Sequence, residues 1–205
     1  MRPFLISLLA SSAVAIALAG CAPKNPDATA TVTTPQSAVT PTGAVAPAAA
    51  SVVDDKTKSF VEKAAITDMF EVEAGKIALT RSKVGPIKAF AQMMIDDHSA
   101  TTKNLEPLAT AAGVVPPSAL DNDHLSKLDD LQKIKDADFD KKYLDQQESA
   151  HSDALNLMKD YAQNGKNPGI QAFAIKVSGK VEEHLQKAKA LQKSGLATIT
   201  KDNKN

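Results

Sequence analysis

The 205-residue chain contains no tryptophan, a single cysteine and only 4% aromatic residues. One cysteine excludes an intrachain disulfide and a cysteine-rich zinc site. Basic and acidic residues number 24 each, so the chain lacks the basic excess that is typical of nucleic-acid-binding proteins. The scarcity of aromatic residues, together with abundant alanine, leucine and lysine, favours helices over sheets.

Residues 1–20 have the pattern of a signal peptide: a basic residue, an apolar run over 4–18 and small residues before Cys21. The apolar run is shorter than the roughly 20 residues that a membrane-spanning helix needs. The segment Leu18-Ala19-Gly20-Cys21 resembles the lipobox of bacterial lipoproteins. This resemblance implies that Cys21 carries lipid, and Ala22 after it implies an outer-membrane anchor with the domain in the periplasm. In a host with one membrane, the anchor would be on its outer face. The alternative is a plain secretory signal.

A tether is predicted to follow the signal peptide over residues 21–53. Residues 22–53 hold 9 alanines, 6 threonines and 5 prolines, with charges only at Lys24 and Asp27. Such a segment buries too little apolar surface to offset the entropy of ordering its backbone. We therefore expect it to be disordered, and we expect the same of the last residues, 201–205.

Helical periodicity dominates the remaining domain, residues 54–200. It predicts four long helices and one short one, and no strand. Gly75 and Gly179 fall inside helices, where glycine is costly, so a close approach of a neighbouring helix is expected at each. His124 is expected at the surface of the short helix. The predicted ranges are 57–82, 86–112, 121–134 (the short helix), 137–164 and 168–194.

An internal repeat shows how these helices are arranged. Residues 85–91 (GPIKAFA) resemble residues 168–174 (PGIQAFA), and both segments open the second helix of a hairpin. Two similar hairpins joined by a longer connection that contains the short helix predict a ferritin-like four-helix bundle. A simple up-down-up-down bundle is the alternative.

Several motifs carry a family resemblance over residues 55–194. They are FVEKAA at 60–65, FEVEAG at 70–75, FAQMMIDDH at 90–98 and EHL at 183–185. With these motifs the chain resembles the family called domain of unknown function family 4142. The resemblance implies a ferritin-like fold and an outer-membrane location, and it implies no specific activity.

Three histidines, His98, His151 and His184, fall at inward-facing positions of three helices and at similar depths in the bundle. Glu71, Glu73 and Glu148 are the carboxylates predicted near them. Ferritin-like bundles hold metals at this level, so this group predicts a centre for one divalent metal or copper ion. The alternative is a set of buried side chains that hydrogen-bond one another and fix the helix register.

The expected site departs from a di-iron centre, which uses Glu-x-x-His on two helices. Only residues 148–151 have that spacing, because Ile95 and Val181 precede the other two histidines. No dinucleotide or phosphate-binding loop is present, and nothing else indicates catalysis. The sequence therefore predicts a lipid-anchored envelope protein with a structural or interaction role, for which another envelope protein is the candidate partner. A metal-binding or redox protein is the alternative.

Overall fold

The computed structural model describes residues 53–202, with side chains through residue 195. Within this range the chain forms five helices and no strand. The predicted signal peptide, Cys21 and the tether up to residue 52 lie outside the described residues, as do residues 203–205. The helices are α1 (Asp55–Arg81), α2 (Gly85–Ala111), α3 (Asn122–Lys133), α4 (Asp136–Asn164) and α5 (Pro168–Asp202).

Local side-chain chemistry sets several helix ends. The Asp54 carboxylate accepts a hydrogen bond from the Thr57 backbone N–H at 3.1 Å and so caps the start of α1. Asp121 caps α3 in the same way, accepting from the His124 N–H at 2.8 Å. Gly113 follows α2 with a φ of +75°, a conformation that glycine adopts without a steric penalty.

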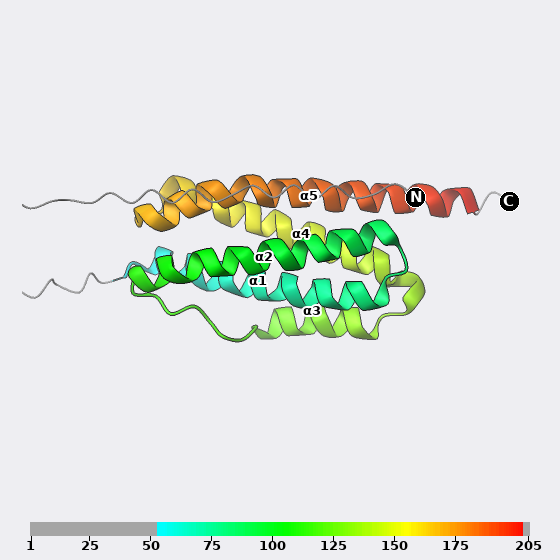
Figure 1. The fold of residues 1–205 in the computed structure, drawn as a ribbon, viewed down its shortest axis with the longest axis horizontal. Helices are drawn as coiled ribbons and strands as arrows, with labels where there is room; N and C mark the ends of the chain where they lie inside the picture. Colours follow the sequence, from blue (N-terminus) through cyan, green and yellow to red (C-terminus); the bar gives the residue numbers. More distant parts are fainter. Residues whose placement is uncertain (1–52, 203–205) are drawn as a thin grey trace, which may run out of the picture. The chain divides into compact units, whose positions relative to one another are not determined.

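The four long helices form a bundle of two antiparallel hairpins, α1–α2 and α4–α5 (Figure 1). Between the hairpins, α1 contacts α4 and α2 contacts α5. The connection with α3 runs back along the bundle, so α4 starts at the end where α2 started (Figure 1). Every contacting pair of long helices is therefore antiparallel, which is the connectivity of ferritin-like bundles with one crossover. The predicted fold class is confirmed.

Contacts at both ends of α1 fix this crossover. At its end, the Arg81 guanidinium donates to the backbone carbonyl of Ile134 at 2.6 Å and to the Asp136 carboxylate. At its start, the Thr57 and Tyr161 hydroxyls are 2.6 Å apart. The start of α4 is thus held at the end of α1, and the end of α4 at the start of α1.

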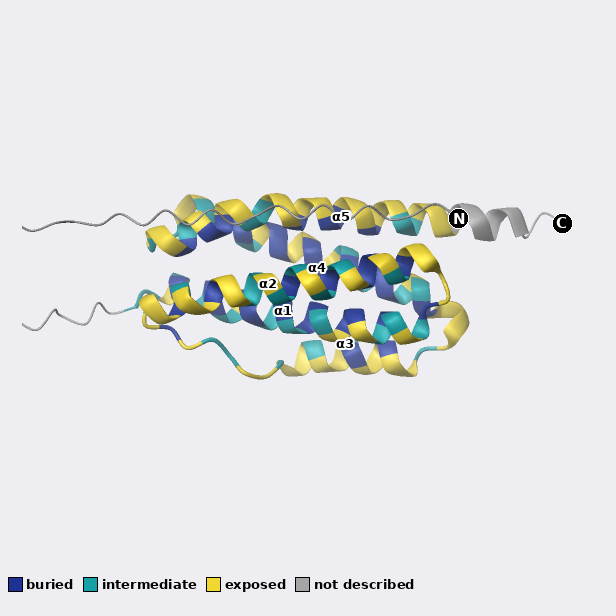
Figure 2. Ribbon diagram, viewed as in Figure 1, coloured by how far each residue is buried: buried dark blue, intermediate teal, exposed yellow. Residues whose placement is uncertain are grey.

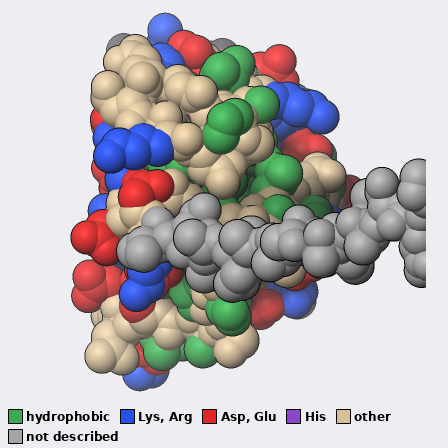
Figure 3. Space-filling model, turned by 90° about the vertical axis from the view of Figure 1, so that its left-hand side faces the viewer, with side chains coloured by type: hydrophobic (Ala, Val, Ile, Leu, Met, Phe, Trp, Pro, Cys, Tyr) green, Lys and Arg blue, Asp and Glu red, His purple; other side chains and the backbone are tan. Residues whose placement is uncertain are grey.

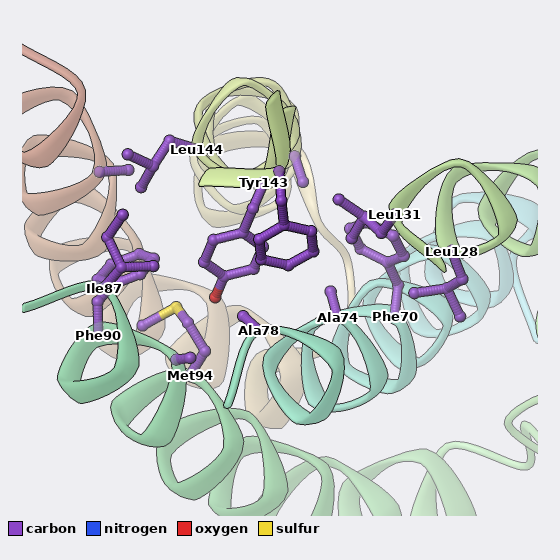
Figure 4. Close-up of a cluster of buried hydrophobic side chains, with 14 residues drawn as sticks. Phe70, Ala74, Ala78, Ile87, Phe90, Met94, Leu128, Leu131, Tyr143 and Leu144 are labelled. Atoms are coloured by element: carbon purple, nitrogen blue, oxygen red, sulfur yellow. The ribbon is translucent and has the colours of Figure 1, made fainter. Parts of the chain in front are cut away.

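The core has two apolar ends and a polar middle. One apolar cluster contains Phe70, Phe90, Met94 and Tyr143 and lies toward the α1–α2 turn (Figure 4). The other, around Phe60, lies toward the start of α1. Figure 2 shows that buried positions continue along the inner faces between these ends. The buried polar side chains of this middle band are Asp68, Glu71, His98, Gln147, His151 and His184.

Several sequence-based expectations need correction. The last helix does not end before Gly195 but continues to Asp202, inside the predicted tail. Val53, assigned to the tether, packs against the apolar cluster around Phe60. The His124 side chain is only 19% exposed, because its ring lies 5.2 Å from that of Phe70.

The two helical glycines differ. A Cβ atom on Gly75 would lie 2.8 Å from Ile95 Cγ1 and 2.9 Å from the Ala91 carbonyl oxygen, so α1 and α2 approach closely there. A Cβ atom on Gly179 would meet nothing within 4 Å. The expected close approach of a neighbouring helix is therefore present at Gly75, and the same expectation for Gly179 is wrong.

The surface of the bundle is mixed in charge. Figure 3 shows acidic and basic side chains interspersed on the end of the bundle where α1 begins. Among the described helices, none combines the length and the apolar character that a membrane crossing requires.

Candidate metal centre

Three buried histidines meet in the polar middle of the bundle. His98 comes from α2, His151 from α4 and His184 from α5, and none is more than 4% exposed. The ring centroids are 5.4–5.6 Å apart in all three pairs. Each histidine has one ring nitrogen that can serve as a metal ligand, and these three nitrogens lie within 4.8 Å of one another. The structure thus brings together the three histidines that the sequence placed at one level.

Each imidazole has one nitrogen held by a neighbouring acceptor. His98 Nδ1 lies 2.7 Å from Asp68 Oδ1 on α1, and His184 Nε2 lies 2.9 Å from Asp97 Oδ2 on α2. His151 Nδ1 donates to the Gln147 carbonyl at 2.8 Å. Acceptors of this kind, bonded to the outer nitrogen, commonly orient histidines that bind metals.

The second nitrogen of each ring has no partner. His98 Nε2, His151 Nε2 and His184 Nδ1 are all buried and make no hydrogen bond. A buried polar atom without a partner costs about 1–3 kcal/mol, so three together are unusual in a folded protein. Because the opposite nitrogens are occupied, these are the nitrogens left to bind a shared ligand. A ligand shared by all three would remove this cost.

The acceptors also determine which nitrogen carries the proton. A backbone carbonyl can only accept, so the proton of a neutral His151 sits on Nδ1 and leaves a lone pair on Nε2. An ionised Asp68 or Asp97 acts in the same way on His98 or His184. The unpartnered nitrogen of His151 is then a lone-pair donor, as a metal ligand must be, and those of His98 and His184 are lone-pair donors when Asp68 and Asp97 are ionised.

Burial keeps two of the rings neutral. It lowers the pKa of His98 to about 4, although the nearby Glu71 carboxylate opposes the shift. It also lowers the pKa of His184 to about 4, against the opposing effect of the hydrogen bond to the Asp97 carboxylate. Burial raises the pKa of Asp68 well above its usual value. At neutral pH, His98 and His184 are therefore unprotonated and able to bind a cation.

Glu71 lies beside His151 but outside the group of three converging histidines. It is fully buried, and its Oε2 accepts a hydrogen bond from Gln147 Nε2 at 2.6 Å. Its Oε1 lies 3.7 Å from His151 Nδ1, the nitrogen that donates to the Gln147 carbonyl. The predicted proximity is present, but Glu71 is not a member of the group of three converging ligands.

The other two predicted carboxylates lie elsewhere. Glu73 is exposed and pairs with Lys76 at 2.7 Å, and Glu148 pairs with Lys189 at 3.7 Å near the surface. The expectation that they surround the centre is wrong. Glu73 is two residues from Glu71 and therefore faces the opposite side of the helix. The Glu-x-x-His spacing at 148–151 contributes only its histidine.

Sequence reasoning missed Asp68, Asp97 and Gln147. Asp68 lies three residues before Glu71 and so on the same helix face, a spacing that could have identified it. Asp97 is adjacent to His98 and points toward α5, which no periodicity in one helix reveals. Gln147 acts through its backbone carbonyl, for which the sequence carries no signal.

The spacing of the rings suits one metal ion. Three atoms within 4.8 Å of one another share a centre no more than about 2.8 Å from each. Imidazole nitrogens bind zinc at about 2.0–2.1 Å, so the rings would have to move inward by about 0.7 Å or less. Imidazole ligands suit zinc, copper, iron and nickel.

The family model for "Domain of unknown function (DUF4142)" matches residues 42–191. The chain belongs to the DUF4142 family. No curated protein matches it. Among solved structures, this DUF4142 chain is similar to "Crystal structure of DUF305 fragment from Deinococcus radiodurans", with a TM-score of 0.62 and 11% sequence identity. The similarity covers 69% of this chain and 98% of the other, and at that identity it supports the helical fold alone.

Proposed function

We propose that this protein binds one transition-metal ion on His98, His151 and His184 in the middle of its bundle. The observation that carries the proposal is a cluster of three buried histidines, each with one ring nitrogen that has no hydrogen bond, whose candidate ligand atoms lie within 4.8 Å of one another. The oriented outer nitrogens and the lowered pKa values of His98 and His184 support it. The buried carboxylates nearby would offset the charge of the cation.

The rival interpretation, a hydrogen-bonded core, accounts for less of the geometry. It explains the contacts of His98 with Asp68 and of His184 with Asp97. It leaves one nitrogen of each ring buried without a partner, at a cost that apolar side chains would avoid. A purely structural role, which the sequence favoured, gives no reason for three such atoms at one point.

The location of the protein is a second part of the proposal. A lipid on Cys21 would hold the bundle at the cell envelope, with the tether between lipid and domain. Support comes from the lipobox-like segment and from the position of the only cysteine in the chain. The metal centre would then lie in an extracytoplasmic compartment, where a membrane-held protein could bind or store a metal ion.

The test is unfolding of the full chain in detergent, with and without zinc, cobalt, nickel, copper, manganese or iron salts. A metal that binds only the folded state raises the free energy of unfolding by about 2.7 kcal/mol at a hundredfold excess over the dissociation constant. His151→Ala should remove this increase. His124→Ala is the matched control, because His124 lies outside the cluster, and it should keep the increase.

Two results would contradict the proposal. One is the absence of a stability change with every metal in the wild-type protein. The other is an equal change in wild type and in His151→Ala, which would place the metal elsewhere. Elemental analysis of the purified protein gives the metal-to-chain ratio, for which we expect one.

A further inference from the structure

A small cavity lies against the histidines on the side toward the start of α1. Its volume is about 10 Å³, which is close to the smallest space that holds one water molecule. His98 and His184 line it, together with Asp68 and the threonines Thr67 and Thr101. The other lining side chains, such as Val181 and Met158, are apolar except for that of Lys180, an exposed residue. A small polar molecule placed here would touch the two histidines and find hydrogen-bonding groups beside them.

The number of protein ligands leaves room for such a molecule. Among the described residues, the converging group consists of three imidazoles and no carboxylate. Glu71 is not part of this group, although its Oε1 lies 3.7 Å from His151 Nδ1. Zinc and related ions that have three protein ligands complete their coordination with a molecule from solution, whereas structural sites are closed by four protein ligands.

We infer that the metal keeps one coordination position open toward this cavity, and that water or a small anion bound through a single atom fills it. The inference rests on the proposed function and extends it from metal binding to binding of a small exogenous ligand. The size of the cavity sets the class of ligand, because a larger anion would displace the helices around it.

A route for exchange with solvent lies next to the cavity. A surface pocket of about 440 Å³ between α1, α3 and α4 shares three lining residues with it: Thr67, Ala154 and Leu157. Those three side chains therefore separate the cavity from solvent on that side. Thr67 and Leu157 are only partly buried, so this wall is thin. A ligand of a few atoms needs only a small movement of these side chains to enter.

The experiment uses the full chain loaded with Co²⁺, whose visible spectrum reports the number and kind of its ligands. Azide and fluoride are the probes, added separately after cobalt binding is complete. We expect each to change the spectrum in a saturable way without releasing cobalt. Phosphate, which exceeds the cavity, should leave the spectrum unchanged.

A cavity-filling variant identifies the place of binding. Ala154→Val adds two methyl groups at the wall of the cavity and should weaken azide binding at least tenfold while cobalt still binds. Ala150→Val is the matched control: it makes the same change one turn away on α4, where the side chain lines the outer pocket but not the cavity. It should bind azide as wild type does.

The outcomes separate the two proposals. Failure of the wild-type protein to bind cobalt or any other metal overturns the proposed function and this inference with it. Cobalt binding with a spectrum that neither azide nor fluoride changes overturns the open position alone. An equal azide response in Ala154→Val and wild type overturns the cavity as its location. The wild-type titration decides the open position even if Ala154→Val does not fold.

Discussion

Individual ionisable residues make the metal-free centre sensitive to acid. His184 is buried with a pKa of about 4, whereas a histidine in the unfolded chain titrates near 6.5. Between these pH values the unfolded chain binds a proton that the folded chain does not bind. Stability is therefore complete above pH 6.5 and falls as the pH drops toward 4. His98 acts in the same direction, and Asp68, with its raised pKa, opposes it.

We therefore predict that chelator-treated protein loses stability between pH 6.5 and 4.5, and that His184→Gln shows a shallower loss. Urea unfolding at several pH values measures both. Surface carboxylates do not obscure the effect, because those with lowered pKa values titrate below 3.8 and therefore outside the range from pH 6.5 to 4.5. They are Asp54, Asp121, Asp136 and Asp160. A stability that is flat with pH, or an unchanged slope in His184→Gln, would contradict the prediction.

The sequence could identify the histidines but not all of their partners. A residue every three or four positions on an apolar stripe must face the core, so His98, His151 and His184 were predictable. Which carboxylate meets which ring depends on the rotation of two helices about their own axes. That rotation is set by side-chain packing, and it turned Glu148 outward and Asp97 toward α5.

At the scale of helices, close packing within the first hairpin depends on one glycine. Gly75→Ala would place a Cβ atom against the Ala91 carbonyl, which belongs to the backbone of α2 and cannot rotate away. We predict a loss of about 1–3 kcal/mol in the free energy of unfolding, the range for overpacked cores.

Gly179→Ala is the matched control on α5, and it should have the opposite effect. No atom lies within 4 Å of its new Cβ, so the variant gains about 0.5–1 kcal/mol from the better helix propensity of alanine. Denaturant unfolding of both variants measures the difference. Equal changes in the free energy of unfolding of the two variants would show that the close approach of α1 and α2 does not limit the residue at position 75.

The helices themselves were predictable because caps, glycines and prolines mark most of their ends. The end of α5 was not, since Gly195 carries a signal for helix termination that the structure does not follow. A glycine lowers helix stability without forcing an end, and neighbouring residues decide the outcome. The two hairpins followed from the internal repeat, which no single helix would reveal.

For the whole molecule, the crossover connection creates the site. Because α3 and its flanking loops carry the chain back along the bundle, α1 and α4 run antiparallel, as do α2 and α5 (Figure 1). The middles of the four helices then lie at one level, where α2, α4 and α5 supply the histidines and α1 supplies Asp68 and Glu71. The match to the DUF4142 family covers this whole arrangement.

The anchoring of the molecule is the remaining prediction, and it concerns Cys21 alone. Bacterial lipoproteins carry their lipid on a cysteine thiol, and Cys21 is the only cysteine in the chain. Cys21→Ser should therefore abolish labelling by a radioactive or clickable fatty acid and release the protein from the membrane fraction. Cell fractionation with immunoblotting measures the release. Ala22→Ser is the neighbouring control and should leave labelling intact. Membrane association of Cys21→Ser at the wild-type level would contradict lipid anchoring. It would leave the proposal for the three-histidine cluster, which lies wholly within the bundle, unaffected.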